Sequence, residues 1–379
     1  MTRFIKTTLA AAAALLASTA ALADITIGIS LPLTGTGSGL GIPAGNGIKM
    51  WPATIGGEKT RVIILDDATD PTKGVQNARR LVNEDKVDVI VGSVITPVAI
   101  AISEVAAESK TVQLALSPIG LPPGKDAWSF RLPQSNNVMA IPMVAHMAKH
   151  GVKTVGFLGF TDAYGEQWLQ ALKPLLDTAG IKLVATERFA RSDTSVTAQA
   201  LKLAAANPDA MVVVASGSGA AMPELGLIER GYKGKFYQTH GAASKDLIRL
   251  GGKAVEGTFV VAGPVVVAEQ LPDSNPSKAV GVKFNAAYEA IYGPGSRNQF
   301  AAHGWDTYLV LDRVIPIALK QGKPGTAEFR AALKAALEST PSVVVTQGVL
   351  DYTPTEHWGF GPNTGVMMKI VNGDWKLEQ

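Results

Sequence analysis

Short apolar runs alternate with amphipathic stretches along most of this 379-residue chain. In the first third, four runs are apolar at nearly every position, which is typical of strands buried on both faces of a parallel sheet. These runs are 25–31, 62–66, 87–92 and 112–116. The stretch 72–84 between two of them places Val75, Ala78 and Leu81 on one face of a helix. Asp70 just before it is suited to cap that helix.

The same alternation returns after residue 138. Strands are predicted there at 154–158, 183–187, 211–216 and 235–238, and helices at 164–179, 195–206 and 222–230. Repeated strand–helix alternation predicts doubly wound parallel sheets with helices on both faces. The expected fold class is therefore α/β, with two such lobes.

The segment between the two series, 130–137, shows no clear periodicity and is interpreted as a crossover strand. Further helices are predicted at 276–292, 301–320 and 326–338. In the tail, Asn372-Gly373 stands between apolar runs, which predicts a β-hairpin.

Residues 1–23 have the pattern of a signal peptide. Arg3 and Lys6 precede an apolar run over 9–21, and Ala21-Leu22-Ala23 supplies a small-x-small cleavage site. The run is shorter than the roughly 20 residues that a membrane-spanning helix needs. We therefore expect an exported, periplasmic chain that begins at Asp24 after cleavage.

Composition excludes several classes of protein. Without the signal peptide the charges nearly balance, and no cluster of Lys and Arg predicts a nucleic-acid partner. The absence of cysteine excludes disulfides, thiolate nucleophiles and zinc–cysteine sites. An apolar fraction of 46% is consistent with a core that holds the fold without such crosslinks.

No catalytic or metal-binding motif is complete. Gly39-Leu40-Gly41 only roughly resembles a dinucleotide loop, and no G-x-S-x-G occurs. His146 and His150 stand four residues apart on a predicted helix and could bind a metal, but no glutamate follows His146 as H-E-x-x-H requires. We interpret the pair as a solvated helix face and expect no enzyme activity, no cofactor and no metal.

Several motifs occur in an order and at spacings that are specific together. They are ITIGISLPLTGTGSGLG at 25–41, DDATDP at 66–71, ARRL at 78–81, VDVIVGS at 87–93, LSP at 116–118, FR at 130–131, TDAYGE at 161–166 and MPELG at 222–226. On these motifs the chain resembles the periplasmic Leu/Ile/Val-binding family of ABC-transporter solute-binding proteins, and within it the branch that binds aromatic carboxylates.

The resemblance implies a type I periplasmic binding protein, in which two lobes joined by a three-crossing hinge close on a ligand. Lobe 1 would comprise 24–134 and 265–346, and lobe 2 would comprise 135–264 and 347–379. The expected partners are a small carboxylate and an inner-membrane ABC permease, and a monomer is expected.

The resemblance also places the ligand at strand ends in the cleft, where helix N-termini suit a carboxylate. The predicted ligand-binding residues are Leu40, Val94, Ile95, Thr96, Ile119, Gly120, Tyr164, Ser218, Gly219, His240 and Phe300. Simpler roles stay open for some of them: a helix cap for Thr96, core packing for Tyr164 and Phe300, and a tight turn for the glycines.

One departure from the family pattern bears on the ligand. Amino-acid binders of this family carry a glutamate in a P-E-G sequence that pairs with the ligand's ammonium group, whereas this chain has Thr239-His240-Gly241. A buried ammonium without an acidic partner is costly. We therefore expect a ligand without an α-ammonium, such as benzoylformate or a benzoate relative, with His240 bonded to one of its oxygens.

Three alternatives remain at this point. His240 could be a solvated loop residue, the ligand could be an amino acid after all, and the protein could present its ligand to a receptor rather than to a permease.

Overall fold

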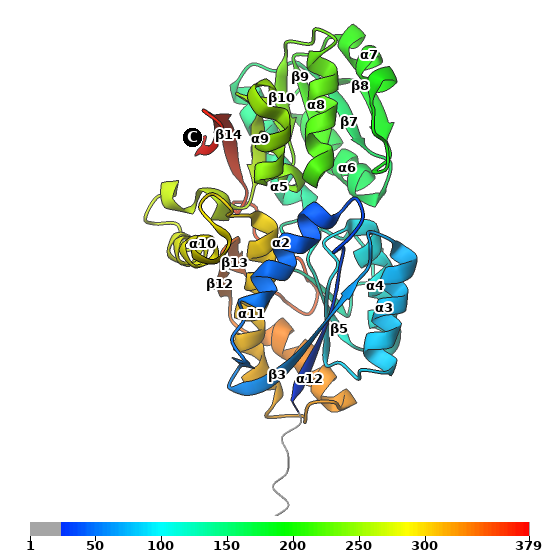
Figure 1. Cartoon of the computed structure of the whole chain (residues 1–379), viewed down its shortest axis with the longest axis vertical. Helices are drawn as coiled ribbons and strands as arrows, with labels where there is room; N and C mark the ends of the chain where they lie inside the picture. The colour runs from blue at the N-terminus through cyan, green and yellow to red at the C-terminus, as the bar shows by residue number, and fades with distance from the viewer. Residues whose placement is uncertain (1–23, 379) are drawn as a thin grey trace, which may run out of the picture.

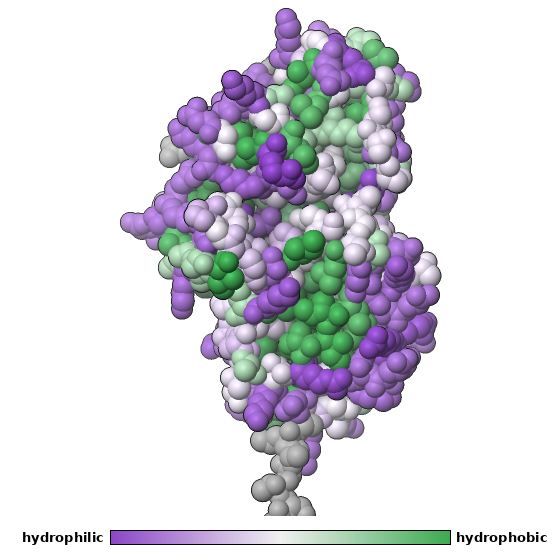
Figure 2. Space-filling model, in the orientation of Figure 1, coloured by the Kyte–Doolittle hydropathy of each residue, from purple (hydrophilic) through white to green (hydrophobic). Residues whose placement is uncertain are grey.

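Residues 24–378 of the computed structural model form two α/β lobes stacked along the long axis of the molecule (Figure 1). The signal peptide predicted over residues 1–23 lies outside the described residues. Within 24–378, no helix combines the length and apolar character needed to cross a membrane. Figure 2 shows a waist between the lobes and an apolar patch on the face of the lower lobe.

The lower lobe contains a six-stranded sheet with the strand order β2-β3-β1-β4-β5-β6. Its strands are β1 (Ile25–Leu31), β2 (Thr54–Ile55), β3 (Glu58–Asp66), β4 (Val89–Gly92), β5 (Val112–Ala115) and β6 (Ser129–Arg131). All pairs are parallel except β2 with β3. The predicted strands at 25–31, 87–92 and 112–116 are confirmed, and their runs are buried on both faces. The run at 62–66 is also a strand, as part of β3, but the expectation that it is buried is wrong, because its side chains are exposed or half-buried.

Helices α2 (Ser38–Lys49), α3 (Pro71–Asn83) and α4 (Thr96–Ser109) belong to this lobe. The carboxylate of Asp70 accepts hydrogen bonds from the amides of Thr72 and Lys73, so the predicted cap of α3 is confirmed.

The upper lobe contains a seven-stranded sheet with the strand order β15-β14-β11-β10-β9-β7-β8. Its strands are β7 (Thr154–Phe160), β8 (Lys182–Phe189), β9 (Ala210–Val214), β10 (Lys235–Gln238), β11 (Phe259–Ala262), β14 (Val366–Val371) and β15 (Asp374–Leu377). Its helices include α5 (Asn136–Lys149), α6 (Ala163–Thr178), α7 (Thr197–Ala206), α8 (Ala221–Ile228) and α9 (Lys245–Gly251). Asn372 and Gly373 both have positive φ in the β14–β15 turn, which confirms the predicted hairpin.

The remaining elements are α10 (Lys278–Tyr292), α11 (Gln299–Ala318), α12 (Ala327–Ser339), β12 (Val343–Val345) and β13 (Gly348–Leu350). Side chains of α11 and α12 share the apolar core of the lower lobe. The chain leaves the lower sheet after β6 and the upper sheet after β11, and it returns to the upper sheet after β13. Three segments therefore connect the lobes.

The sequence pattern predicted no helix over 38–49, where α2 lies. Each glycine disfavours a helix by about 1 kcal/mol relative to alanine, so a segment with this many glycines is not predicted to be helical. The glycines serve close packing instead. A Cβ on Gly47 would lie 2.0 Å from the carbonyl oxygen of Ala301, and one on Gly304 would lie 2.4 Å from that of Ala44. The backbones of α2 and α11 therefore touch directly.

The crossover strand expected over 130–137 is also shorter than predicted. The strand, β6, ends at Arg131, and α5 begins at Asn136. The hydroxyl of Ser135 accepts a hydrogen bond from the amide of Val138 and caps this helix. The serine was overlooked as a helix cap because the segment shows no clear periodicity.

Candidate functional site

A small cavity of about 20 Å³ lies between the two lobes. Its walls come mainly from residues that follow the carboxyl ends of strands or open the next helix, where α/β sheets commonly bind ligands. The lining residues are Leu40, Val94, Thr96, Leu116, Ser117, Pro118, Pro133, Tyr164, Arg191, Ser216, His240, Gly241, Phe300 and His303. Because they belong to both lobes, the cavity depends on how the lobes meet.

Six of the eleven predicted site residues line this cavity. They are Leu40, Val94, Thr96, Tyr164, His240 and Phe300. Ile95 is instead the N-cap residue of α4, and Ile119 is buried in a small apolar cluster with Ala99 and Ala115. Ser218 and Gly219 lie in a short 3-10 helix, Gly217–Ala220, outside the cavity lining.

Gly120 takes part in a contact between the lobes rather than in the cavity. Its amide donates to Oε1 of Gln167 on α6, and Nε2 of Gln167 donates back to its carbonyl, each over 3.1 Å. A second close contact joins α2 to the upper lobe, because a Cβ on Gly217 would lie 2.5 Å from Cδ1 of Leu40. The structure therefore shows the lobes closed on one another.

Arg191, which sequence reasoning missed, brings a positive charge into the cavity wall. Its Nε donates to Asp162 over 2.5 Å, its Nη1 donates to Ser216 over 2.8 Å, and its guanidinium lies 4.1 Å from the ring centre of Phe160. Nη2 makes no hydrogen bond to any residue of the described chain, so it can donate to an anion. The available signal was its place directly after β8, at the carboxyl end of a parallel strand.

Two buried histidines face the cavity, and all four of their ring nitrogens lack a hydrogen-bond partner within residues 24–378. Burial lowers the pKa of His240 to about 3. The pKa of His303 is also lowered to about 3, by burial and then by repulsion from His240. Both rings are therefore neutral at physiological pH, and each offers one N–H donor and one acceptor.

His240 is 3% exposed, so the alternative of a solvated loop histidine is wrong. His303 was not among the predicted site residues, although it lies one turn beyond Phe300 and thus on the same face of α11. Nε2 of Gln299 donates to the carbonyl oxygen of His240 over 3.2 Å and ties the two segments together.

Tyr164 contributes its ring to the cavity, but its hydroxyl is already engaged. That oxygen accepts a hydrogen bond from the amide of Gly241 over 3.1 Å and shares another with Thr239 Oγ1 over 2.8 Å. Burial raises the pKa of Tyr164 to about 12, so the phenol stays protonated. The side chain supports the loop that carries His240.

The lower lobe supplies hydroxyl groups to the cavity. Thr96 opens α4 and is 2% exposed, and its side chain caps nothing, because the cap position belongs to Ile95. Ser117 follows β5, and its buried Oγ has no partner among the described residues. The N-terminus of α4 adds the positive end of a helix dipole beside these hydroxyls.

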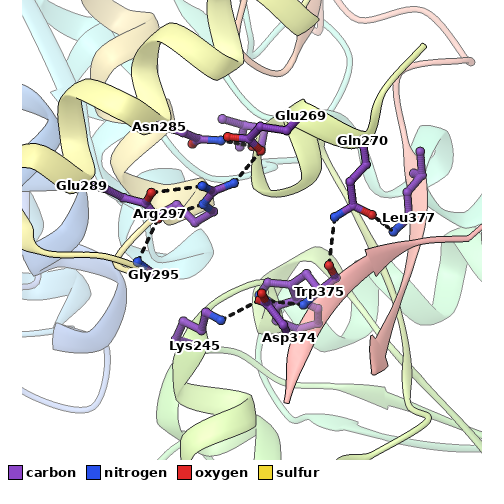
Figure 3. A network of polar contacts seen from close by, with 11 residues as sticks. Lys245, Glu269, Gln270, Asn285, Glu289, Gly295, Arg297, Asp374, Trp375 and Leu377 are labelled. Carbon is purple, nitrogen blue, oxygen red and sulfur yellow. Dashed lines mark hydrogen bonds and ion pairs between the residues drawn. The ribbon is translucent and has the colours of Figure 1, made fainter. Parts of the chain in front are cut away.

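A polar network outside the cavity holds the start of α11 in place (Figure 3). The guanidinium of Arg297 lies between the carboxylates of Glu289 and Glu269, with Nε and Nη2 donating to Glu289 over 2.8 and 3.0 Å. Arg297 directly precedes the cap residue Asn298, whose side chain accepts from the amides of the first turn. The network therefore helps to orient Phe300 and His303.

No aspartate or glutamate belongs to the described cavity lining. Asp162 comes near through Arg191, but its carboxylate is used by that ion pair and by the amides of Tyr164 and Gly165. The cavity thus holds a guanidinium, hydroxyls and neutral imidazoles between apolar walls, a combination suited to an anion with an apolar body.

Comparison with known proteins agrees with this architecture. A family model described as periplasmic binding protein matches residues 24–369. The chain belongs to this family. Members of this family are exported, and they bind ligands rather than catalyse reactions. In ABC transporters they deliver the ligand to a permease.

Individual relatives cover most of this periplasmic binding protein. A Leu/Ile/Val-binding protein homolog from Brucella melitensis is 29% identical over 353 residues, which is 89% of each chain. The crystal structure of an extracellular ligand-binding receptor from Rhodopseudomonas palustris HaA2 is 46% identical, with a TM-score of 0.92 over 94% of this chain and 100% of that one.

A more distant structure shows the same fold. It is a solute-binding protein of an ABC transporter from Rhodopseudomonas palustris BisB5, in complex with 3,4-dihydroxy benzoic acid. It is 23% identical with a TM-score of 0.78 and covers 93% of this chain and 95% of that one. The fold class expected from the sequence is confirmed.

Proposed function

We propose that this protein is the periplasmic, monomeric solute-binding component of an ABC importer and that it captures a small aromatic carboxylate. The observation that carries the proposal is the closed cavity, which offers hydrogen-bond donors and a positive charge but no acidic side chain. The proposal includes cleavage after residue 23 and the lobe boundaries 24–134 with 265–346 and 135–264 with 347–379.

The carboxylate of the ligand would be held from both lobes. Thr96 and Ser117 offer hydroxyls beside the N-terminus of α4, and Arg191 offers Nη2 from the opposite lobe. A charge-assisted hydrogen bond contributes roughly 1.5–3 kcal/mol net. An anion that bonds to both lobes stabilises the closed arrangement, because neither lobe alone provides the complete set of donors.

The aromatic ring would lie among the apolar side chains of the cavity. Leu40, Val94 and Leu116 approach from the lower lobe, the ring of Tyr164 from the upper lobe and Phe300 from α11. In this closed arrangement the cavity itself has a volume of only about 20 Å³, which is room for about one water molecule. A ring therefore requires the lobes to separate as it enters, and a ligand of about 11 heavy atoms would need roughly 0.7 kcal/mol per atom for micromolar affinity.

The imidazoles add a requirement for a second polar group on the ligand. Leaving a buried donor or acceptor unpaired costs about 1–3 kcal/mol. A ring hydroxyl or an oxo group can pair with His240 and His303, whereas unsubstituted benzoate has no second polar group once its carboxylate is bound elsewhere. We expect hydroxybenzoates or 2-oxo aryl acids to bind more tightly than benzoate. The fold neighbour in complex with 3,4-dihydroxy benzoic acid is compatible with this class of ligand.

A branched-chain amino acid is the second candidate, because the Brucella melitensis relative is named as a Leu/Ile/Val-binding homolog. An α-ammonium would require an acidic partner, and the carboxylate of Asp162, which approaches the cavity through Arg191, is already paired with that residue. The absence of an acid from the described lining favours the aryl acid.

A thermal-shift screen distinguishes the two candidates. The protein would be tested with benzoate, 4-hydroxybenzoate, benzoylformate and leucine at equal concentration. A ligand at 100 times its Kd stabilises the native state by about 2.7 kcal/mol. We expect stabilisation by the aryl acids and little by leucine. A larger response to leucine than to every aryl acid would contradict the proposed ligand class.

A further inference from the structure

The upper lobe contains a second cluster of potential ligand atoms. His146 lies in the last turn of α5, His150 caps that helix at its C-terminal end, and Glu378 follows β15. One side-chain nitrogen or oxygen from each residue lies within 4.8 Å of the others. A backbone hydrogen bond of 2.9 Å from Glu378 to the carbonyl of Met367 on β14 holds the chain in this position.

The sequence interpretation of the two histidines as a solvated helix face is wrong for His146. This side chain is 6% exposed and lies against Tyr237 and Phe259, with the His150 ring stacked on it at 3.9 Å. Burial, followed by the proximity of His150, lowers the pKa of His146 to about 4, so the ring is neutral.

The hydrogen bonds around the two rings leave a nitrogen lone pair on each. Nδ1 of His150 lies 2.8 Å from the carbonyl oxygen of His146, and because a carbonyl only accepts, this nitrogen donates. The lone pair of His150 is then on Nε2, in the arrangement that metal-bound histidines usually show. Nδ1 of His146 lies 3.0 Å from the Tyr237 hydroxyl, and its buried Nε2 has no hydrogen-bond partner in the described chain. In the tautomer in which Nδ1 donates to this hydroxyl, the lone pair of His146 is on Nε2.

The distance between His146 and Glu378 fits a shared ion better than a hydrogen bond. Nε2 and Oε1 are 3.8 Å apart, beyond hydrogen-bond range. Two ligands held at about 2.1 Å by one tetrahedral zinc ion are about 3.4 Å apart. A small rotation of the partly exposed Glu378 side chain closes that difference, and its negative charge offsets the nearby Lys149.

We propose that His146, His150 and Glu378 bind a divalent transition-metal ion such as Zn²⁺, at a site separate from the solute cavity. Two imidazoles and one carboxylate are a common ligand set for zinc, and a water molecule would complete the coordination. The ion would join the segment after β15 to the end of α5.

The test uses protein without a polyhistidine tag, titrated with ZnCl₂ by isothermal calorimetry and followed by thermal melting. We expect Zn²⁺ to bind and raise Tm, and Mg²⁺, which prefers a shell of oxygen ligands, to do neither. His150→Gln and Glu378→Gln should each weaken Zn²⁺ binding at least tenfold. Glu229→Gln, an exposed carboxylate elsewhere on the same lobe, should leave it unchanged.

No detectable binding of Zn²⁺ would overturn the proposal. Binding that survives both variants at the same affinity would also overturn it, because the ion would then lie elsewhere. If His150→Gln fails to fold by circular dichroism, Glu378→Gln decides alone, since its side chain is 25% exposed and can be changed without disturbing the core.

Discussion

Replacing Arg191 by methionine should remove the positive charge from the solute cavity while keeping the length of the side chain. Nη2 is the group of this residue that has no protein acceptor, and a lost charge-assisted hydrogen bond costs about 1.5–3 kcal/mol. That free energy corresponds to roughly a 10- to 150-fold rise in Kd. The measurement is calorimetric titration with the aryl acid that stabilises the wild-type protein most.

Arg188→Met is the matched control. Arg188 lies three residues earlier, on β8, and its side chain is 39% exposed. It pairs with Glu166 on α6, the helix whose N-cap residue, Asp162, pairs with Arg191. The control removes an equal charge from the same region without touching the cavity, so its Kd should stay within about twofold. An unchanged Kd for Arg191→Met would refute the assigned role. Equal weakening in both variants would show a general charge effect instead.

Three further outcomes follow from the structure. The affinity for the aryl acid should stay constant within about twofold from pH 5 to 8, because His240 and His303, with pKa values lowered to about 3, remain neutral throughout. A tenfold fall in affinity on acidification would contradict this. In urea denaturation, Gly47→Ala should lower the free energy of unfolding by about 1–3 kcal/mol through overpacking against α11. Gly45→Ala should leave it unchanged or raise it by up to about 1 kcal/mol, because a Cβ there would lie 3.7 Å from its nearest neighbour, a methyl carbon of Leu31. Gln167→Ala should speed ligand release by about threefold or more in stopped-flow experiments, since it removes two hydrogen bonds between the closed lobes; an unchanged rate would show that these bonds do not hold the closed state.

Local patterns in the sequence were sufficient for much of the fold. β1 occurs with the bounds that its apolar run predicted, because a strand buried on both faces is apolar along most of its length. Asp70 before Pro71 and the Asn372-Gly373 pair also act as expected, since caps and tight turns depend on a few neighbouring residues. These features required no knowledge of distant contacts.

Helix α2 could not be predicted from local sequence patterns. Its glycines argue against a helix when only neighbouring residues are considered, yet each of Gly41 and Gly47 has a backbone oxygen from another segment within about 2 Å of where a Cβ would be. The helix forms because α11, more than 250 residues away in the sequence, packs against it. Such contact energies appear only in the tertiary structure.

The sequence by itself determined the fold class, most strands and helices, and the region of the cleft, with six of the cavity-lining residues among those it selected. Only the tertiary structure decided that Arg191 and His303 join them and that Gly120 bonds across the lobes. The physical reason is that side-chain chemistry is written in the sequence, whereas burial and the pairing of polar groups depend on which distant segments meet when the lobes close.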